Sequence, residues 1–284
     1  MRPAKPLALL AGAAALAAAA ALRHAVGRPL CFCVYYGNVG AGVERWLRGC
    51  RVAVLAPTLP RGVLAGLRAA GVEAFGYVSA TTLGGWEPWA GLAPRSVILG
   101  NASTGWGERV VDACSPAWAR VLRRAVEMLA GKGYRGVFLD NLDMADRYPW
   151  MRPCVARLVR SVKKWAPGMM VMVNRGFSLL PEIAGSIDYL LFEDFATYYD
   201  PRTGSYRVFP ATDLEWEKRV LDEAATLAER NGFRVLLLAY APPGGHALLE
   251  RICREWRSWG RGLPLYVAPG LLQAPGVCNP CGSG

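Results

Sequence analysis

The chain has 284 residues, of which 53% are hydrophobic and 19% charged, a composition that excludes intrinsic disorder and predicts a folded domain with a large core. The net charge of +11 favours a polyanionic surface or partner but is too diffuse to name one. Only His24 and His246 are present, so a zinc site built on several histidines is excluded, and a Ser-His-Asp triad would depend on His246.

The N-terminal segment has the pattern of an export signal: a basic start, seventeen apolar residues and a polar exit. Residues 1–27 are therefore predicted to be a signal peptide or an N-terminal membrane anchor formed by residues 6–22. The apolar run is at the lower limit for crossing a bilayer, about 17–25 residues, and its alanine content favours cleavage. The protein is expected to be secreted or at the cell surface, and without this segment its charge is about +8.

All eight cysteines follow the export signal, and an even number in an exported chain is compatible with disulfides. Cys31 and Cys33 are two apart on a predicted strand and so share a face. Cys278 and Cys281 form a CxxC unit in a Cys/Gly-rich tail, residues 277–284. We expect a disulfide in this tail in preference to a redox site, and a redox site in preference to zinc, because no second cysteine pair lies nearby.

Eight short β-branched or aromatic runs follow, each bounded by Gly, Pro or polar residues. Most are continuously apolar, as expected of strands covered on both faces by helices. The predicted strands are Cys31–Tyr36, Val52–Leu55, Glu73–Ser79, Gly136–Asp140, Met169–Asn174, Ile187–Asp194, Phe233–Tyr240 and Leu263–Val267.

Helical stretches lie between these runs. Ser115 supplies an N-cap before Pro116, and Gly131 can close that helix. Thr212 and Glu215 have the spacing of a capping box, which predicts a helix running to Asn231-Gly232. Further helices are expected at Arg61–Ala70, Pro153–Trp165 and Leu179–Ala184, and another is expected to open at His246.

Eight strands alternating with helices predict a single (β/α)8 TIM barrel over residues 28–276, with enlarged loops after strands 3 and 6. The alternatives are two small domains or an open doubly wound sheet. The strands leave no gap for a domain boundary, and the turn Gly37–Gly42 lacks the GxGxxG spacing of a dinucleotide-binding sheet. We expect a monomer.

Polar side chains end most of the predicted strands, where the active site of such a barrel lies. Asp140 ends strand 4 and Glu193 ends strand 6, so their carboxylates can face each other across the mouth, as glycosidic bond cleavage requires. The alternative is a structural role in which they pair with Arg147, Arg175 or a helix N-terminus. The candidate substrate-binding residues are Tyr36, Tyr77, Asp143, Asn174, Tyr240 and Trp86. Strands 2 and 8 end in Leu55-Ala56-Pro57 and Val267-Ala268-Pro269, whose apolar residues offer little for catalysis or substrate binding.

Asp140 and Asp143 could also bind a metal ion through their carboxylates, but their spacing is not that of a recognised cation site. No metal or cofactor is therefore expected, and Asp143 is interpreted as a partner of the site or a helix cap. Asp194 should point away from the mouth if Glu193 points into it.

Aromatic residues are concentrated in the two enlarged loops, where their flat faces can stack on sugar rings. Loop Ala80–Cys114 carries Trp86, Trp89 and Trp106 and a possible extra strand at Ser96–Leu99. Loop Phe195–Ala211 carries Tyr198, Tyr199, Tyr206 and Phe209. Most of these rings are expected to pack beneath their own loops, leaving one or two to face the mouth.

The run Gly133–Asp143 resembles the "GFDGVFLDxxD" strand-4 signature of glycoside hydrolase family 114, the endo-α-1,4-polygalactosaminidase-like barrels. Tyr36-Gly37-Asn38, Gly76–Ser79, Asn174 and Glu193 support the resemblance. It implies an exported enzyme that cleaves α-linked galactosamine-containing polysaccharide, with Asp140 as nucleophile and Glu193 as general acid/base. Members commonly have an acidic residue ending strand 2 and Gly-Glu after the strand-3 serine, where this chain has Leu55-Ala56-Pro57 and Ala80-Thr81-Thr82.

Two functions follow as hypotheses. The first is an exported glycoside hydrolase that cleaves an α-linked amino-sugar polysaccharide with a carboxylate pair. The alternative is a catalytically impaired barrel that binds cell-surface polysaccharide without cutting it. A deacetylase is disfavoured by the shortage of histidines and metal ligands, and no nucleic-acid partner is expected.

Overall fold

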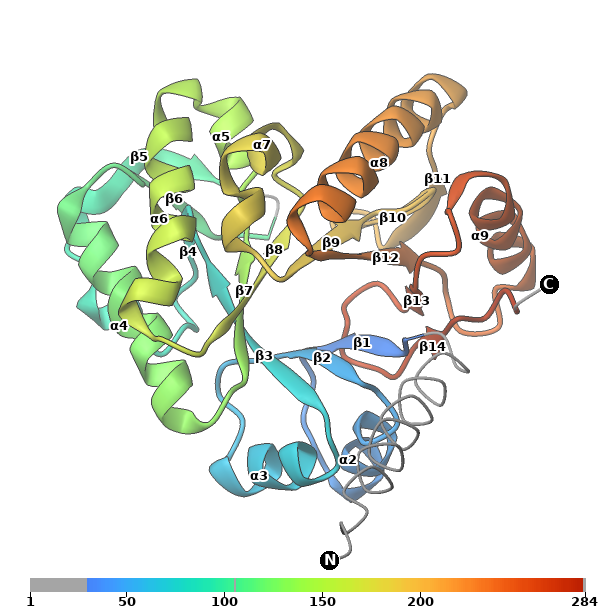
Figure 1. The fold of residues 1–284 in the computed structure, drawn as a ribbon, viewed down its shortest axis with the longest axis horizontal. Helices are drawn as coiled ribbons and strands as arrows, with labels where there is room; N and C mark the ends of the chain where they lie inside the picture. The colour runs from blue at the N-terminus through green and yellow to red at the C-terminus, as the bar shows by residue number, and fades with distance from the viewer. Residues whose placement is uncertain (1–29, 105, 283–284) are drawn as a thin grey trace, which may run out of the picture. The chain divides into compact units, whose positions relative to one another are not determined.

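The computed structural model describes residues 30–104 and 106–282; the predicted export signal lies outside them. Eight parallel strands hydrogen-bond in chain order in one sheet (Figure 1), which confirms the predicted barrel-like single domain. The strands are β1 (Phe32–Tyr35), β2 (Val52–Leu55), β3 (Glu73–Ser79), β7 (Gly136–Asp140), β8 (Met170–Asn174), β9 (Tyr189–Glu193), β12 (Arg234–Tyr240) and β13 (Leu265–Ala268).

The sheet is nearly closed, and the C-terminal tail bridges the seam between β13 and β1. Strand β14 (Val277–Cys278) pairs antiparallel with β13, and Cys278 forms a disulfide with Cys31 at the start of β1. Across the seam the rings of Phe32 and Tyr266 lie 5.7 Å apart between centroids. The tail therefore belongs to the barrel wall.

Helices surround the outside of the sheet, and several of them pack an apolar face against its strands (Figure 1). They are α2 (Ala41–Leu47), α3 (Arg61–Ala69), α4 (Pro116–Lys132), α5 (Met144–Arg147), α6 (Arg152–Trp165), α7 (Leu180–Ile183), α8 (Ala211–Asn231) and α9 (His246–Trp259). Single 3-10 turns lie at Ala90–Leu92, Arg95–Val97, Pro149–Met151, Phe177–Leu179 and Ala184–Ser186.

The helix caps agree with the sequence only in part. Ser115 caps α4 as predicted, with its hydroxyl accepting from the Ala117 N–H at 3.2 Å. The helix ends at Gly133, which has the left-handed φ of 109° that closes a helix, and not at Gly131. The predicted capping box at Thr212 is wrong: Pro210 is the N-cap of α8, since its ring already fixes a φ of −57°, and no side chain caps the helix.

Both enlarged loops contain β structure. The insertion after β3 forms a three-stranded sheet in the order β4 (Thr82–Leu83), β6 (Arg109–Val111) and β5 (Ile98–Ser103), so the extra strand lies two residues later than predicted. The loop after β9 forms the hairpin β10 (Thr197–Asp200) and β11 (Ser205–Val208). Hydrogen-bonded strands make these loops ordered walls above the carboxyl ends of the barrel strands.

Three disulfides cross-link the barrel: Cys31–Cys278, Cys114–Cys154 and Cys253–Cys281. The tail thus contains disulfides, but its two cysteines pair with the barrel and not with each other. Cys33 and Cys50 are free and buried. Three disulfides indicate an extracytoplasmic protein. Within the described residues, no helix combines the length and apolar character needed to cross a membrane.

Candidate active site

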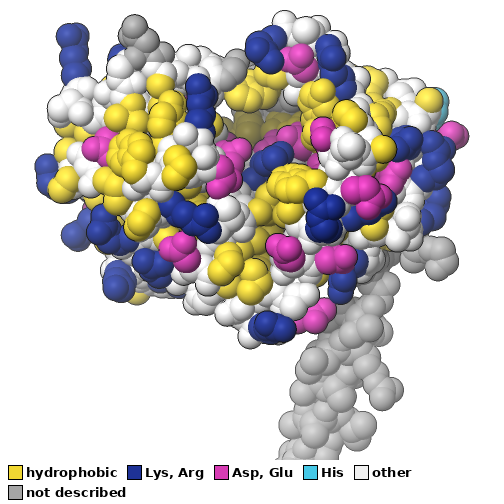
Figure 2. All heavy atoms as spheres, turned by 90° about the horizontal axis from the view of Figure 1, so that it is seen from above, with side chains coloured by type: hydrophobic (Ala, Val, Ile, Leu, Met, Phe, Trp, Pro, Cys, Tyr) yellow, Lys and Arg dark blue, Asp and Glu magenta, His cyan; other side chains and the backbone are white. Residues whose placement is uncertain are grey.

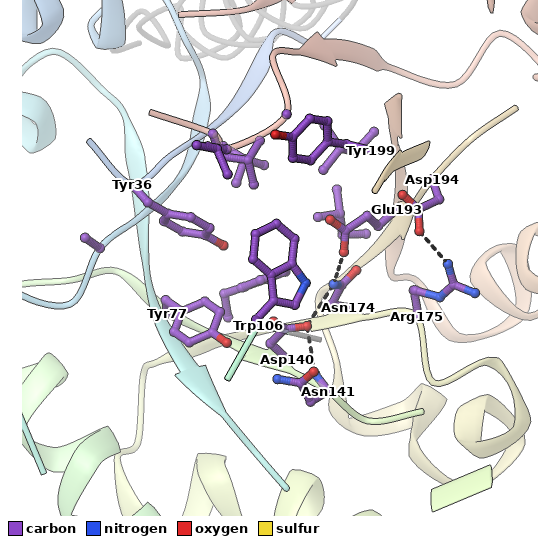
Figure 3. A pocket seen from close by; sticks show the side chains of 18 of the residues that line it. Tyr36, Tyr77, Trp106, Asp140, Asn141, Asn174, Arg175, Glu193, Asp194 and Tyr199 are labelled. Carbon is purple, nitrogen blue, oxygen red and sulfur yellow. Dashed lines mark hydrogen bonds and ion pairs between the residues drawn. The ribbon is translucent and has the colours of Figure 1, made fainter. Parts of the chain in front are cut away.

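A cavity of about 800 Å³ opens at the carboxyl ends of the parallel strands (Figure 3). All eight side chains singled out from the sequence line it, each carried there by the end of a strand or by the loop that follows. They are Tyr36, Tyr77, Trp86, Asp140, Asp143, Asn174, Glu193 and Tyr240. The geometry therefore brings the predicted residues into one space.

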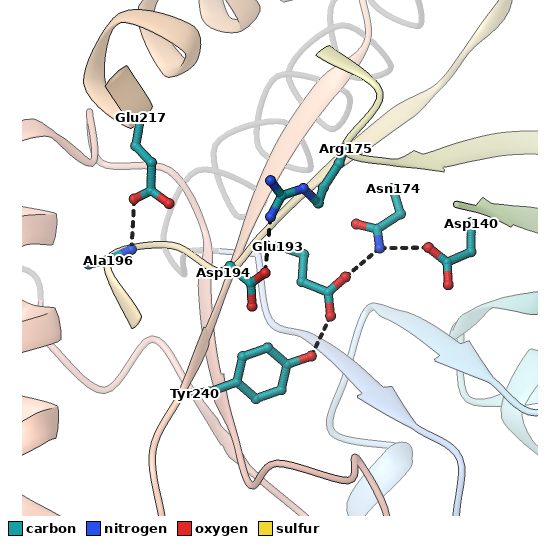
Figure 4. Close-up of polar contacts among 8 residues, drawn as sticks. All are labelled: Asp140, Asn174, Arg175, Glu193, Asp194, Ala196, Glu217 and Tyr240. Atoms are coloured by element: carbon teal, nitrogen blue, oxygen red, sulfur yellow. Dashed lines mark hydrogen bonds and ion pairs between the residues drawn. The ribbon is translucent and has the colours of Figure 1, made fainter. Parts of the chain in front are cut away.

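Asn174 lies between Asp140 and Glu193 and donates to both through one amide nitrogen (Figure 4). Its Nδ2 is 2.8 Å from Asp140 Oδ1 and also bonds Glu193 Oε2. The Tyr240 hydroxyl donates to the other oxygen of Glu193. Because the two N–H bonds of an amide diverge, acceptors that share it lie about 5 Å apart. The two carboxylates are thus held at a fixed, short separation.

The backbone turns sharply after Asp140, Asn174 and Glu193. Asn141, Arg175 and Asp194 follow them directly and have left-handed φ values of 60°, 51° and 67°. This conformation costs a non-glycine residue about 1–2 kcal/mol, and such strain clusters at functional sites. One result is that the Asn141 N–H donates to Asp140 Oδ1 at 2.7 Å.

The turn after β9 corrects the prediction that Asp194 points away from the mouth. That prediction assumed extended backbone, in which successive side chains alternate. With its positive φ, Asp194 also lines the cavity, and its carboxylate pairs with Arg175 at 3.0 Å (Figures 3 and 4). Arg147, the other suggested structural partner, lies over the ring of Tyr148.

The surroundings of the carboxylates raise their pKa values. Desolvation, with added repulsion from Glu193, raises the pKa of Asp140 to about 7. Desolvation and the nearby charge of Asp194 raise the pKa of Glu193, while donation from Tyr240 and Asn174 opposes the rise. Desolvation raises the pKa of Asp194 itself to about 6. The pair Asp140 and Glu193 therefore retains a proton closer to neutral pH than ordinary carboxyl groups do.

Asp143 stands at the N-cap position of α5, but its side chain makes no capping hydrogen bond. The helix-cap interpretation is therefore wrong, and the carboxylate lines the cavity instead. Within the described residues no group of His, Cys, Asp and Glu side chains has the arrangement of a metal site.

Glu108 is a cavity residue that the strand-ending rule missed, because it lies in the insertion just before β6. It is buried, and it accepts from the Tyr77 hydroxyl at 3.2 Å, the Thr82 hydroxyl at 2.8 Å and Asn141 Nδ2 at 3.1 Å. Only the folded three-stranded sheet brings it to the mouth, so sequence position alone gave no signal for it.

Aromatic rings form part of the cavity wall. Trp86 and Trp106 line it while remaining more than half exposed, and Tyr199 of the β10–β11 hairpin joins them. Other loop rings pack internally, as expected for most of them: Trp89 is fully buried, and Tyr198 lies 4.7 Å from Phe209 between ring centroids.

The loop after β13 also contributes, although the strand end itself, Val267-Ala268-Pro269, does not line the cavity. Gly270, Leu271, Leu272 and Gln273 line the cavity. A Cβ at Gly270 would lie 2.3 Å from the ring of Tyr199, so glycine is needed for the hairpin to reach this wall. The apolar end of β2 adds only Ala56 and Thr58.

The cavity is acidic although the chain is basic. Among the described residues that line it are five carboxylates and one cation, Arg175. Figure 2 shows acidic side chains in and beside the hollow on this face, with most Lys and Arg outside it. The acidic residues are Glu108, Asp140, Asp143, Glu193 and Asp194.

Comparison with known proteins agrees with this geometry. The model of glycoside-hydrolase family GH114 matches residues 48–258. The glycoside hydrolase domain of PelA from Pseudomonas aeruginosa is similar in structure, with a TM-score of 0.75 and 25% identity over 88% of this chain and 98% of that one. Ega3 from Aspergillus fumigatus, solved with galactosamine, has a TM-score of 0.67 at 16% identity over 89% of this chain and 95% of its own. No curated protein sequence matches. The chain belongs to glycoside-hydrolase family GH114.

Proposed function

We propose that this glycoside hydrolase cleaves an α-linked amino-sugar polysaccharide by a retaining mechanism. The observation that carries the proposal is the shared amide of Asn174 in an acidic, aromatic cavity. One oxygen of Asp140 and one of Glu193 bind the same nitrogen, and hydrogen-bond geometry places these two oxygens about 5 Å apart or less. Retaining enzymes place their carboxyl groups about 5–5.5 Å apart, whereas inverting enzymes leave about 6.5–9.5 Å for a water molecule.

Asp140 is the proposed nucleophile. Its Oδ1 accepts from two N–H groups, of Asn174 and Asn141, which stabilise the ionised form. The carboxylate attacks the anomeric carbon of the sugar, the bond to the leaving oxygen breaks, and a covalent glycosyl–enzyme ester forms.

Glu193 is the proposed general acid and base. Protonated, it gives its proton to the leaving oxygen; in the second step it takes a proton from the water that hydrolyses the ester. Tyr240 orients one oxygen of Glu193 and Asn174 the other, so the carboxyl group is held in place through both steps. Because the pKa values of both carboxyl groups are raised, the required state with one proton on the pair is populated close to neutral pH.

The acidic lining supports a cationic substrate. An amino sugar carries an ammonium group, and five carboxylates around one cavity attract it even though the chain as a whole is basic. The galactosamine in the Ega3 structure and the polysaccharide expected of the family point to the same class of sugar. Trp86, Trp106 and Tyr199 offer ring faces for the apolar sides of sugar residues.

We further propose that the enzyme is exported by residues 1–27, either cleaved or kept as an anchor by residues 6–22, and that it acts as a monomer without a cofactor. The barrel then spans residues 28–276, and the tail at 277–284 adds β14 to its wall. The three disulfides support export, since such bonds persist in oxidising compartments.

A substrate panel tests the function. Purified protein is offered α-1,4-linked galactosamine polymer, its N-acetylated form and β-1,4-linked glucosamine polymer, and new reducing ends are measured. Release from the first polymer is expected, with none from the β-linked one. Binding to the polymers without release from any of them would refute hydrolysis and favour the alternative, a barrel that binds polysaccharide without cutting it.

A further inference from the structure

We propose that Glu108 is the residue that recognises the ammonium group of the reacting amino sugar. The inference rests on the proposed function and adds a specificity-determining residue to it. It concerns a carboxylate in the inserted sheet, outside the pair that carries the chemistry.

The hydrogen bonds of Glu108 leave one acceptor position open. An ionised carboxylate offers about four lone-pair sites. Among the residues that the structure describes, Oε2 accepts from the Thr82 hydroxyl and Asn141 Nδ2, and Oε1 accepts from the Tyr77 hydroxyl alone. Since Glu108 lines the cavity, a donor on a bound ligand can take the remaining position on Oε1.

Among the described acidic residues that line the cavity outside the reacting pair, Glu108 is the one that is buried without a cation. Its three donors are all neutral, and no ion pair joins it to a Lys, Arg or His among the residues that the structure describes. Asp194, by contrast, is paired with Arg175, and Asp143 is partly exposed to water. A buried carboxylate without a cation is costly, so an ammonium group arriving from the cavity is strongly favoured.

The position of Glu108 fits the chemistry of the sugar. Asn141 joins it to the reacting pair: the Asn141 side chain donates to Glu108, and the Asn141 backbone N–H donates to Asp140. In a 2-amino sugar the nitrogen is bound to the carbon next to the anomeric carbon. A group that recognises this nitrogen must therefore lie near the nucleophile, and a single residue, Asn141, links Glu108 to Asp140.

The test measures how strongly the enzyme prefers a substrate with a free amine over the same substrate with the amine acetylated. Glu108→Gln keeps the size and an acceptor oxygen but removes the charge. With α-1,4-linked galactosamine oligomers we expect kcat/KM to fall about 10- to 100-fold, and with the N-acetylated oligomers to change less than threefold. The matched control is Glu87→Gln, a buried glutamate of the same insertion that accepts from Gly84 N–H and does not line the cavity. Its selectivity should equal that of the wild type.

Binding of the monosaccharides, measured by calorimetry, separates this inference from the proposed function. Galactosamine is expected to bind Glu108→Gln at least tenfold more weakly than the wild type, and N-acetylgalactosamine equally to both, even if no polymer is cleaved. Glu108→Asp, which keeps the charge, should retain part of the preference and serves if the glutamine variant does not fold. Equal losses for the two sugars, or the same shift in Glu87→Gln, would overturn the proposal.

Discussion

The side chain of Asn174 is central to the proposed mechanism, because its one amide group sets the distance between two carboxylates. Its NH2 group is the only side-chain donor the two share within the described chain, and its own Oδ1 is buried without a partner. The amide is therefore oriented by the carboxylates, and the carboxylates by the amide.

Replacing Asn174 by Ala should lower kcat about 100-fold with little change in KM, because the donor stabilises carboxylate charge and geometry in the transition state. Steady-state kinetics on the galactosamine polymer provide the measurement. Asn231→Ala, at the exposed end of α8, is the matched control and should behave as the wild type. A kcat within twofold of the wild type for Asn174→Ala would show that the shared amide has no part in catalysis.

Tyr240 allows a test by pH. Its hydroxyl donates to Glu193 and opposes the rise in the pKa of that carboxyl group. In Tyr240→Phe this opposition is lost, so the pKa of Glu193 rises further and the profile of kcat/KM against pH should move to higher pH. Activity assays between about pH 4 and pH 9 measure the profile. A shift to lower pH would contradict the inference that the Tyr240 hydroxyl lowers the pKa of Glu193.

Residue by residue, the sequence predicted the part of the site that lies at strand ends. Asp140, Asn174 and Glu193 each end a parallel strand, and such ends meet at one edge whatever the loops do. Glu108 could not be found this way, because its place depends on how an inserted loop folds. Asp194 was misplaced because its left-handed backbone breaks the alternation of a strand.

At the scale of elements, the insertion after β3 and the hairpin after β9 turn a plain barrel mouth into a walled cleft. Trp86 and Trp106 come from the first and Tyr199 from the second, and all three line the cavity. The sequence predicted both loops from their length and aromatic content. Of their strands it predicted only the one near Ser96–Leu99, since the others are defined by pairing within the folded insertion and hairpin.

Trp106→Ala should raise KM for the polymer about 3- to 10-fold and leave kcat within twofold, because one stacking surface contributes about 0.5–1.5 kcal/mol and the Trp106 ring is not a hydrogen-bond partner of either reacting carboxylate. Kinetics on polymer of defined length measure both constants. Trp150 is the control: it is 52% exposed but is not among the residues that line the cavity, so Trp150→Ala should leave KM unchanged. Equal effects of the two substitutions would argue against a stacking role for Trp106.

Element boundaries were predicted less well than the elements themselves. The strands were found because continuous apolar runs are required on a sheet buried on both faces. Helix α8 begins at Ala211, next to Pro210, and the Thr212 hydroxyl lies against Asp213. The φ of Pro210 is already compatible with a helix, so α8 begins directly after it. The capping-box pattern at Thr212 therefore did not predict where α8 begins.

For the whole molecule, the buried carboxyl groups link stability to pH. Desolvation raises the pKa of Glu217 on α8 to about 8, although the Ala196 N–H donates to it. A carboxyl group whose pKa is raised by folding stabilises the protein fully below its unfolded pKa, near 4.5, and this contribution is lost as pH rises through about 8. The free energy of unfolding should therefore fall from pH 5 to pH 8.5.

In Glu217→Gln this fall should be smaller, by on the order of 4 kcal/mol, since the amide does not ionise. Urea unfolding at several pH values measures it. The control is Glu223→Gln, an exposed position on the same helix, which should leave the slope unchanged. A slope that is the same in Glu217→Gln and the wild type would contradict the assigned cause.

The distribution of charge over the molecule also bears on which substrate the cavity attracts. Five of the described residues that line the cavity are acidic and one is basic, while most Lys and Arg lie outside it (Figure 2). Net charge alone suggested a polyanionic partner, whereas the local field of the cavity attracts cations. The sequence could not separate the two, because Glu108 and Asp194 were not placed at the mouth.

The carboxylate pair is the centre of this account, and reducing-end release from α-1,4-linked galactosamine polymer by Asp140→Asn and Glu193→Gln tests it most directly. Each substitution keeps the size of the side chain but removes its nucleophilic or acid/base capacity, so each should lower kcat about 100- to 10,000-fold. Glu127→Gln, a surface carboxylate on α4 paired with Arg123, should keep full activity. Wild-type rates of release in either Asp140→Asn or Glu193→Gln would contradict the account.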